Sequence, residues 1–143
     1  MTKKVYKKIT RTPSHAGRIL KSGFMEEHDL RVETVADLLG ITRQHLSRIL
    51  NGHNPITSDI AIKLEMITGT PATQWLAIQA KYDAHILEQG SDYKKYRKAI
   101  HLWAANSLDM QPKDRRGDTK TKELVQEAAG LAKNLSRKKV AAG

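Results

Sequence analysis

The chain has 143 residues, a mass of 16.1 kDa, a hydrophobic fraction of 39% and a formal net charge of +10 at pH 7. This length suits one domain with tails or a small appendage, and the excess of Lys and Arg favours a polyanionic partner, most simply nucleic acid. The absence of cysteine excludes a disulfide framework, a thiolate zinc site and a cysteine nucleophile.

The basic charge is concentrated at the two ends of the chain. Residues 1–31 carry eight Lys and Arg against three Asp and Glu, residues 32–90 carry four against six, and residues 91–143 carry thirteen against six. If the nearly neutral middle segment contacts the bases of a nucleic acid, the two basic ends could contact its phosphates. No apolar run is long enough to cross a bilayer and no secretory signal is evident, so we expect a cytoplasmic protein without a membrane partner.

The N-terminal segment, residues 1–13, has five basic residues and little apolar content, and we interpret it as a flexible basic arm. Lys3 and Lys4 could contact phosphates or a minor groove, the arm could order on a protein partner, or it could remain a solvated tail.

A first helix is predicted after Ser14, because Ile19, Leu20, Phe24 and Met25 are spaced for one helical face. His15 is expected to cap or pack at the start of this helix rather than to act as a ligand. Arg31 lies next to the start of a second helix near Val32, where free N–H groups could meet a DNA phosphate. The alternative is that Arg31 is only solvated.

The most informative stretch is residues 36–52, which reads as two short helices that meet at a glycine. Gly40 falls where the first of them must stop, Ile41 fills the angle, and Thr42 is a good N-cap. The second short helix is then residues 43 to about 50, followed by the stop signal Asn51-Gly52. Its inward face is Leu46, Ile49 and Leu50.

The outward face of this second short helix is entirely polar: Arg43, Gln44, His45, Ser47 and Arg48. Arg can take two acceptors on guanine and Gln can pair with adenine, so such a helix suits the major groove of DNA. We therefore predict a helix-turn-helix, although a generic two-helix corner with a polar exterior would show the same periodicity.

Two further helices follow. Thr57 is a predicted N-cap with Ile56 packing on Ala61 as a hydrophobic staple, and Gly69 ends this fourth helix. Thr70 is predicted to cap a fifth helix with Pro71 at its first position. The fifth helix carries a broad apolar stripe of Trp75, Ile78, Tyr82 and Ile86, widened by Leu76 and Leu87. We interpret part of this stripe as a dimer interface, against the alternative that it lies wholly in the core of one chain.

The C-terminal extension, residues 91–143, is basic and helical in pattern. Tyr93, Tyr96, Ile100 and Trp103 form a narrow stripe that predicts a packed helix, which could cover the domain or contact a partner chain. Residues 109–122 are predicted to be a linker, and a last amphipathic stretch with Leu124, Ala128, Leu131 and Leu135 is expected to be docked or partly disordered.

Catalytic patterns are missing from the sequence. There is no glycine-rich phosphate loop, no Gly-x-Ser-x-Gly elbow and no His pair at i, i+4 on one helix. The sequence therefore predicts no catalytic residue, no metal site and no cofactor, and the protein is not expected to be an enzyme.

The chain resembles the HigA-type antitoxins of the Xre/Cro-like helix-turn-helix class. The resemblance spans roughly residues 15 to 83 and is carried by Arg-Gln-x-Leu-Ser at 43–47 together with Trp-Leu at 75–76 and Gln-Ala-x-Tyr-Asp at 79–83. It implies an all-α fold in which residues 14–90 form a five-helix helix-turn-helix domain with a dimerising last helix, between the arm 1–13 and the helical extension 91–143. Arg31 stands where the family usually has a capping Ser.

The resemblance also implies a function. It implies a homodimer that binds double-stranded operator DNA, represses its own operon and neutralises a small HigB-type ribonuclease toxin. Carried over by position, Arg43, Gln44, Ser47 and Arg48 would face bases, while Thr42 and Asn51 would hold the backbone. The alternatives are a stand-alone or phage-type transcriptional regulator without a toxin partner, and a protein-interaction module whose charge serves only solubility.

Overall fold

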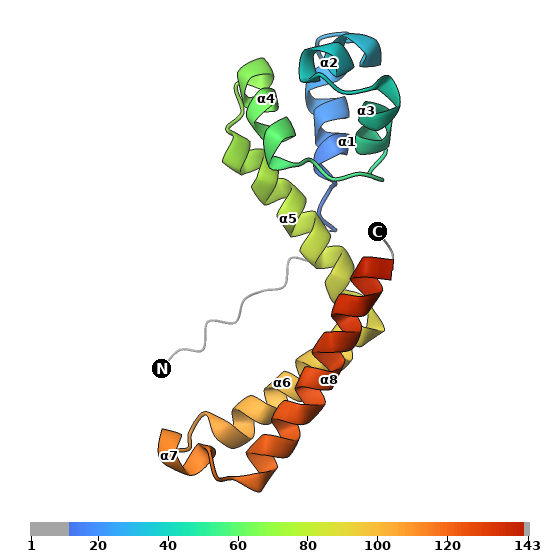
Figure 1. The fold of residues 1–143 in the computed structure, drawn as a ribbon. Helices are drawn as coiled ribbons and strands as arrows, with labels where there is room; N and C mark the ends of the chain where they lie inside the picture. Colours follow the sequence, from blue (N-terminus) through green and yellow to red (C-terminus); the bar gives the residue numbers. More distant parts are fainter. Residues whose placement is uncertain (1–11, 142–143) are drawn as a thin grey trace. The chain divides into compact units, whose positions relative to one another are not determined.

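The computed structural model describes residues 12–141, with side chains described as far as residue 137 (Figure 1). All regular structure in this range is helical, which confirms the predicted all-α fold. The elements are α1 (Ala16–Leu20), the π-helix η1 (Lys21–Met25), α2 (Val32–Leu39), α3 (Arg43–Leu50), α4 (Ser58–Thr68), α5 (Ala72–Glu88), α6 (Ser91–Ser107), α7 (Pro112–Arg115) and α8 (Thr119–Ala141). The basic arm predicted for residues 1–13 lies almost wholly outside the described residues.

The chain divides into two compact units, Met1–His85 and Ile86–Gly143. The division falls within α5, whose last residue, Glu88, lies just before the predicted domain boundary at residue 90. The first unit holds α1 to α4 and most of α5, and the second holds the end of α5 with α6, α7 and α8.

The core of the first unit is apolar and draws on every helix in it. Large side chains that are fully buried come from each of the first four helices: Leu20, Val35, Leu39, Leu46, Ile49 and Leu64. Trp75 of α5 joins the same cluster with 4% of its surface exposed. Burying a side chain of this size contributes about 1.5–3 kcal/mol, so this cluster is what holds α3 in place.

The first predicted helix is continuous but changes its winding at Lys21. The Glu26 N–H donates to the Lys21 carbonyl at 2.9 Å, a bond between residues five apart that defines the wider π turn. Leu20 and Met25 are buried as the spacing predicted, and Ile19 and Phe24 pack on the core while partly exposed. The change to a π-helix was not indicated by the sequence pattern.

The start of α5 differs from the prediction by one residue. Pro71 precedes the helix instead of occupying its first position, and its carbonyl accepts from the N–H groups of Gln74 and Trp75. The cap also differs, because the Glu65 carboxylate on α4 accepts from the Ala72 N–H at 2.6 Å in place of the Thr70 hydroxyl. A carboxylate at the positive end of a helix is favoured by the helix dipole.

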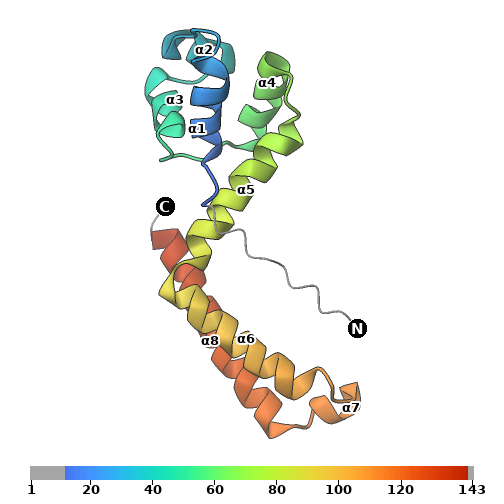
Figure 2. The ribbon, with the colours of Figure 1, turned by 180° about the vertical axis from the view of Figure 1, so that it is seen from behind.

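In the second unit, α6 and α8 lie side by side and run in opposite directions (Figures 1 and 2). Ala99 of α6 and Leu124 and Ala128 of α8 are buried, and the hydroxyls of Ser107 and Thr121 are 2.9 Å apart. The predicted last helix is therefore docked through its first half, and its partner is α6.

The linker predicted at residues 109–122 is mostly structured. It contains α7, and α8 begins inside it at Thr119 because the Asp118 carboxylate accepts from the Thr121 N–H at 2.7 Å as an N-cap. This hydrogen bond lowers the pKa of Asp118 below its usual value. The prediction of a linker was wrong because Pro112 and Gly117 were taken as linker residues, although Asp118 caps a helix directly after them.

Candidate nucleic-acid interface

The turn between α2 and α3 has the geometry that its residues predicted. Gly40 adopts a left-handed conformation with φ +66°, which a residue without Cβ reaches at little steric cost, and it ends α2. Ile41 packs on the core, and the Thr42 hydroxyl accepts from the His45 N–H at 3.0 Å. Helix α3 then runs from Arg43 to Leu50, the predicted range.

Helix α3 buries one face and exposes the other. Leu46, Ile49 and Leu50 are buried. The outward residues divide into the exposed side chains of Arg43, Gln44 and Arg48 and the half-buried side chains of His45 and Ser47. The polar face inferred from the sequence is therefore present, and three of its five side chains are exposed.

Both arginines of α3 make one contact outside the helix. Arg43 Nε lies 3.1 Å from the Glu33 carboxylate in the first turn of α2, with 72% of the Arg43 side chain and 54% of the Glu33 side chain exposed. Arg48 Nε donates to the Asn54 side-chain carbonyl oxygen at 3.3 Å. Glu33 and Asn54 were not predicted from the sequence. The sequence shows only that a polar residue is present before and after α3, and this does not indicate a contact with either arginine.

The two remaining predicted contact residues lie at the ends of the short helices. Asn51 is exposed just after α3, and its amide donates to the Ser47 hydroxyl at 3.4 Å. Arg31 is exposed at the N-cap position of α2 without a side-chain capping bond. The first N–H groups of α2 thus lack the capping side chain that a Ser would supply.

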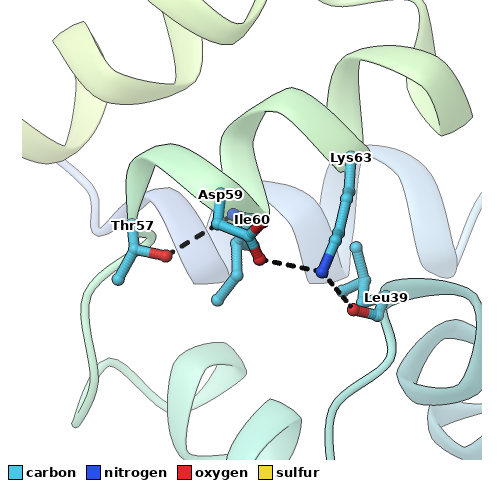
Figure 3. A network of polar contacts seen from close by, with 5 residues as sticks. All are labelled: Leu39, Thr57, Asp59, Ile60 and Lys63. Carbon is cyan, nitrogen blue, oxygen red and sulfur yellow. Dashed lines mark hydrogen bonds and ion pairs between the residues drawn. The ribbon is translucent and has the colours of Figure 1, made fainter.

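Two contacts fix α2 and α3 in position. Lys63 of α4 donates to the Leu39 carbonyl at 3.1 Å and to the Asp59 carboxylate at 2.8 Å, which joins the C-terminal end of α2 to α4 (Figure 3). On the other side, α1 crosses α3 so closely that a Cβ added to Gly17 would lie 1.9 Å from the Ile49 carbonyl oxygen.

A buried polar network joins α1 to α5. His15 is 3% exposed, and its Nδ1 accepts from the Gly17 N–H at 2.9 Å as the N-cap of α1, which confirms the predicted role. Its Nε2 lies 3.2 Å from the amide nitrogen of Gln79, which also donates to the Asp83 carboxylate. The Tyr82 ring meets the His15 ring edge-on at 5.0 Å between centroids. Burial lowers the pKa of His15, opposed by the Asp83 carboxylate.

The four residues predicted for a dimer interface differ in exposure. Trp75 is buried in the core of its own unit, Ile78 and Tyr82 are half-buried, and Ile86 is 49% exposed. Trp75 therefore has almost no surface left for a second chain to contact, as in the alternative that the stripe lies in the core of one chain, whereas Ile78, Tyr82 and Ile86 each keep part of theirs.

No group of three or more metal-ligating side chains is found among the described residues. Within the same part of the chain, no helix has the length and apolar character needed to cross a membrane.

Comparison with known proteins identifies the class to which this geometry belongs. The helix-turn-helix family matches residues 24–75. An HTH-type transcriptional regulator of Haemophilus influenzae is 31% identical over 87 residues, which cover 61% of this chain and 81% of that protein. Antitoxin HigA-1 of Vibrio cholerae is 32% identical over 77 residues, which cover 54% of this chain and 72% of the antitoxin.

Solved structures give the same result. An addiction module antidote protein of the HigA family from Coxiella burnetii is 30% identical with a TM-score of 0.55, over 61% of this chain and 95% of that one. Antitoxin HigA of Pseudomonas aeruginosa, solved with the higBA promoter, is 23% identical with a TM-score of 0.54, over 70% of this chain and 97% of that one, and shares the fold. The chain therefore belongs to the Xre-like helix-turn-helix family of regulators that includes the HigA antitoxins.

Proposed function

We propose that this protein is the antitoxin of a type II toxin-antitoxin pair, which binds its own operator as a homodimer and neutralises a small HigB-type ribonuclease. The observation that carries the DNA-binding part is the outward face of α3, where Arg43, Gln44 and Arg48 are exposed on a helix held by a buried apolar face. Side chains of these types can hydrogen-bond to base edges in the major groove.

Within this proposal the residues of the interface have different roles. Arg43, Gln44 and Arg48 contact bases. His45 and Ser47, whose side chains are half-buried, contact the DNA only where it lies closest to α3. Arg31, Thr42 and Asn51, at the helix ends, contact the DNA backbone, where short side chains and free N–H groups meet phosphates.

The dimer part of the proposal rests on α5. Ile78, Tyr82 and Ile86 present apolar surface at helical spacing along this helix, and a symmetric dimer would bury it. Two copies of α3 would then read a palindrome whose half-sites lie about one helical turn apart, roughly 34 Å.

The toxin part is supported by the two HigA-type relatives, HigA-1 of Vibrio cholerae and the antidote protein of Coxiella burnetii. The alternative is a transcriptional regulator that has no toxin partner. The similarity to the HTH-type regulator of Haemophilus influenzae favours this alternative equally well over the same part of the chain.

The base-reading role is tested by titrating operator DNA with Arg43→Ala. We expect a loss of about 1–3 kcal/mol in binding free energy and relaxed selectivity at one base pair. Lys21→Ala, which removes one exposed positive charge from η1, is the control and should leave selectivity intact. Unchanged affinity and selectivity in Arg43→Ala would contradict the base-reading role.

The toxin role is tested by growth of cells that express the small reading frame next to this gene, with and without this chain. Rescue of arrested growth by both the wild type and the Arg43→Ala/Gln44→Ala double variant would support an antitoxin whose neutralising surface is separate from α3. A harmless or missing neighbour, or failure of both forms, would leave only the transcriptional regulator.

A further inference from the structure

We propose that Glu33 and Asn54 are positioning residues that set the two arginines of α3 for base recognition. The inference rests on the proposed DNA-binding function and deepens it. In each arginine the same atom, Nε, contacts an oxygen from outside α3. Arg43 Nε forms an ion pair with Glu33 Oε1 at 3.1 Å, and Arg48 Nε donates a hydrogen bond to Asn54 Oδ1 at 3.3 Å.

The choice of atom decides what each arginine can still do. A guanidinium has five N–H donors, and four of them are on the two terminal nitrogens. Because both contacts are made at Nε and not at the terminal nitrogens, the terminal edge remains available, and two parallel donors on that edge match the O6 and N7 acceptors of guanine. Among the described residues, no hydrogen bond from the terminal nitrogens of Arg43 or Arg48 to protein is present.

The two positioning residues also come from opposite sides of α3 in the chain. Glu33 is in the first turn of α2, before α3 in the chain, and Asn54 is in the loop after it. Both contacts lie at the surface, where an ion pair or a neutral hydrogen bond adds little to folding stability. Their expected effect is on the arginine conformations, because an exposed arginine otherwise loses rotamer freedom when it binds.

Glu33 is charged and Asn54 is neutral, so substitutions of the two positioning residues should affect DNA affinity differently. Glu33 places a negative charge beside a face that would meet phosphates, so removing the charge should strengthen binding to every DNA sequence. Removing its acceptor oxygen should in addition weaken discrimination between bases. Glu33→Gln removes the charge and keeps an acceptor, whereas Glu33→Met removes both.

The experiment uses the full chain and a randomised duplex library. The duplex that binds best to the wild type is titrated against single base-pair variants of itself, and the affinity ratio at each position is measured for each protein. We expect Glu33→Met to reduce the ratio by on the order of three- to tenfold at the position that Arg43→Ala also relaxes. We expect Glu33→Gln to retain it while binding all duplexes more tightly.

Asn54 is tested in the same way. Asn54→Ala should reduce the ratio at the position that depends on Arg48, and Asn54→Asp, which keeps the acceptor, should retain the ratio while binding all duplexes more weakly. Asp37→Met on α2 and His53→Ala in the loop after α3 are matched controls at exposed neighbours and should leave both ratios unchanged. Thermal unfolding of each variant shows that the fold is intact.

Three outcomes separate the inference from the function on which it rests. Loss of discrimination in Glu33→Met and Asn54→Ala with retention in Glu33→Gln and Asn54→Asp supports the inference. Discrimination that depends on Arg43 or Arg48 but is unchanged in Glu33→Met and Asn54→Ala overturns the inference and leaves the DNA-binding function standing. A wild type without sequence preference overturns both.

Discussion

Gly17 is the residue on which the contact between α1 and α3 depends. A Cβ at this position would lie 1.9 Å from the Ile49 carbonyl oxygen, a backbone atom that cannot move without displacing α3. At the opposite extreme, a Cβ on Gly130 in α8 would meet nothing within 4 Å. The two glycines therefore play different parts, one allowing a close approach and the other only weakening a helix.

Gly17→Ala should accordingly destabilise the protein by roughly 3 kcal/mol, because the new methyl group forces α1 and α3 apart. Gly130→Ala should stabilise α8 by about 0.5–1 kcal/mol, because alanine has the higher helix propensity and has room here. Urea unfolding followed by circular dichroism measures both. Equal effects of the two substitutions would show that the close approach at Gly17 has no energetic weight.

His15 makes stability depend on pH. Burial lowers its pKa in the folded state, so between that value and the unfolded value of about 6.5 the unfolded chain binds more protons. The contribution of neutral His15 is complete above the unfolded pKa and is lost as the pH falls toward the folded one. The free energy of unfolding should therefore decrease on acidification through this window.

The measurement compares urea unfolding at about pH 8 and about pH 5 for wild type and two histidine variants. His15→Asn keeps a capping acceptor without a titrating ring and should show a smaller loss on acidification. His101→Gln, at an exposed histidine of α6, should behave as the wild type does. A pH dependence of His15→Asn identical to that of the wild type would assign the effect to other groups.

At the scale of the elements, the end of α2 is held by a side chain from another helix. The last carbonyls of a helix have no partner within it, and Lys63 supplies one for Leu39 while its charge is balanced by Asp59 (Figure 3). A cation at the C-terminal end of a helix also interacts favourably with the helix dipole. Lys63 thus sets the position of α2 relative to α4.

Lys63→Met should reduce stability by about 1 kcal/mol, since it keeps the aliphatic stem and removes the ammonium group that binds the Leu39 carbonyl. Asp59→Asn is the matched comparison, because it weakens the ion pair on the surface and leaves the contact with α2 in place. We expect a smaller loss for Asp59→Asn in thermal unfolding. If Asp59→Asn lost as much stability as Lys63→Met, the stabilising effect of Lys63 would come from the ion pair and not from its contact with α2.

The elements that the sequence predicted best are those with signals inside them. Thr42 and the Asn51-Gly52 stop signal bracket α3, so its range was predicted correctly. Glu65, which caps α5 from another helix, and Asn54, which contacts α3 from a loop, act through space, and no local pattern marks them. The π-helix η1 was missed for a related reason, because its apolar spacing also suits an ordinary helix.

At the scale of the whole molecule, the second unit adds surface and charge beyond the region matched by the helix-turn-helix family, residues 24–75. Residues 91–143 carry thirteen Lys and Arg against six Asp and Glu, on helices that pack on each other through small and apolar side chains. The sequence predicted these helices but not which one is the partner of the other, because a stripe on one helix does not identify the surface that covers it.

The proposed dimer gives a prediction at this scale. Ile86→Glu places a charge in the proposed interface and should convert a dimer to a monomer in analytical ultracentrifugation, with weaker binding to a palindromic duplex. Leu102→Glu is matched in exposure, since Ile86 and Leu102 are both 49% exposed, and it should leave the mass unchanged. A dimer that survives Ile86→Glu, or a wild type that is already monomeric, would rule out this interface.

The contact between Arg43 and Glu33 has a consequence for how the sequences of relatives diverge. Ten positions separate the two residues in the chain, yet a change at one alters the surroundings of the other. Relatives that have exchanged the arginine for a neutral residue should have been released from any need for the acid, so the two columns of an alignment are expected to covary. A lineage that acquires a new operator would then also show a change at position 33, outside the helix proposed to contact the bases.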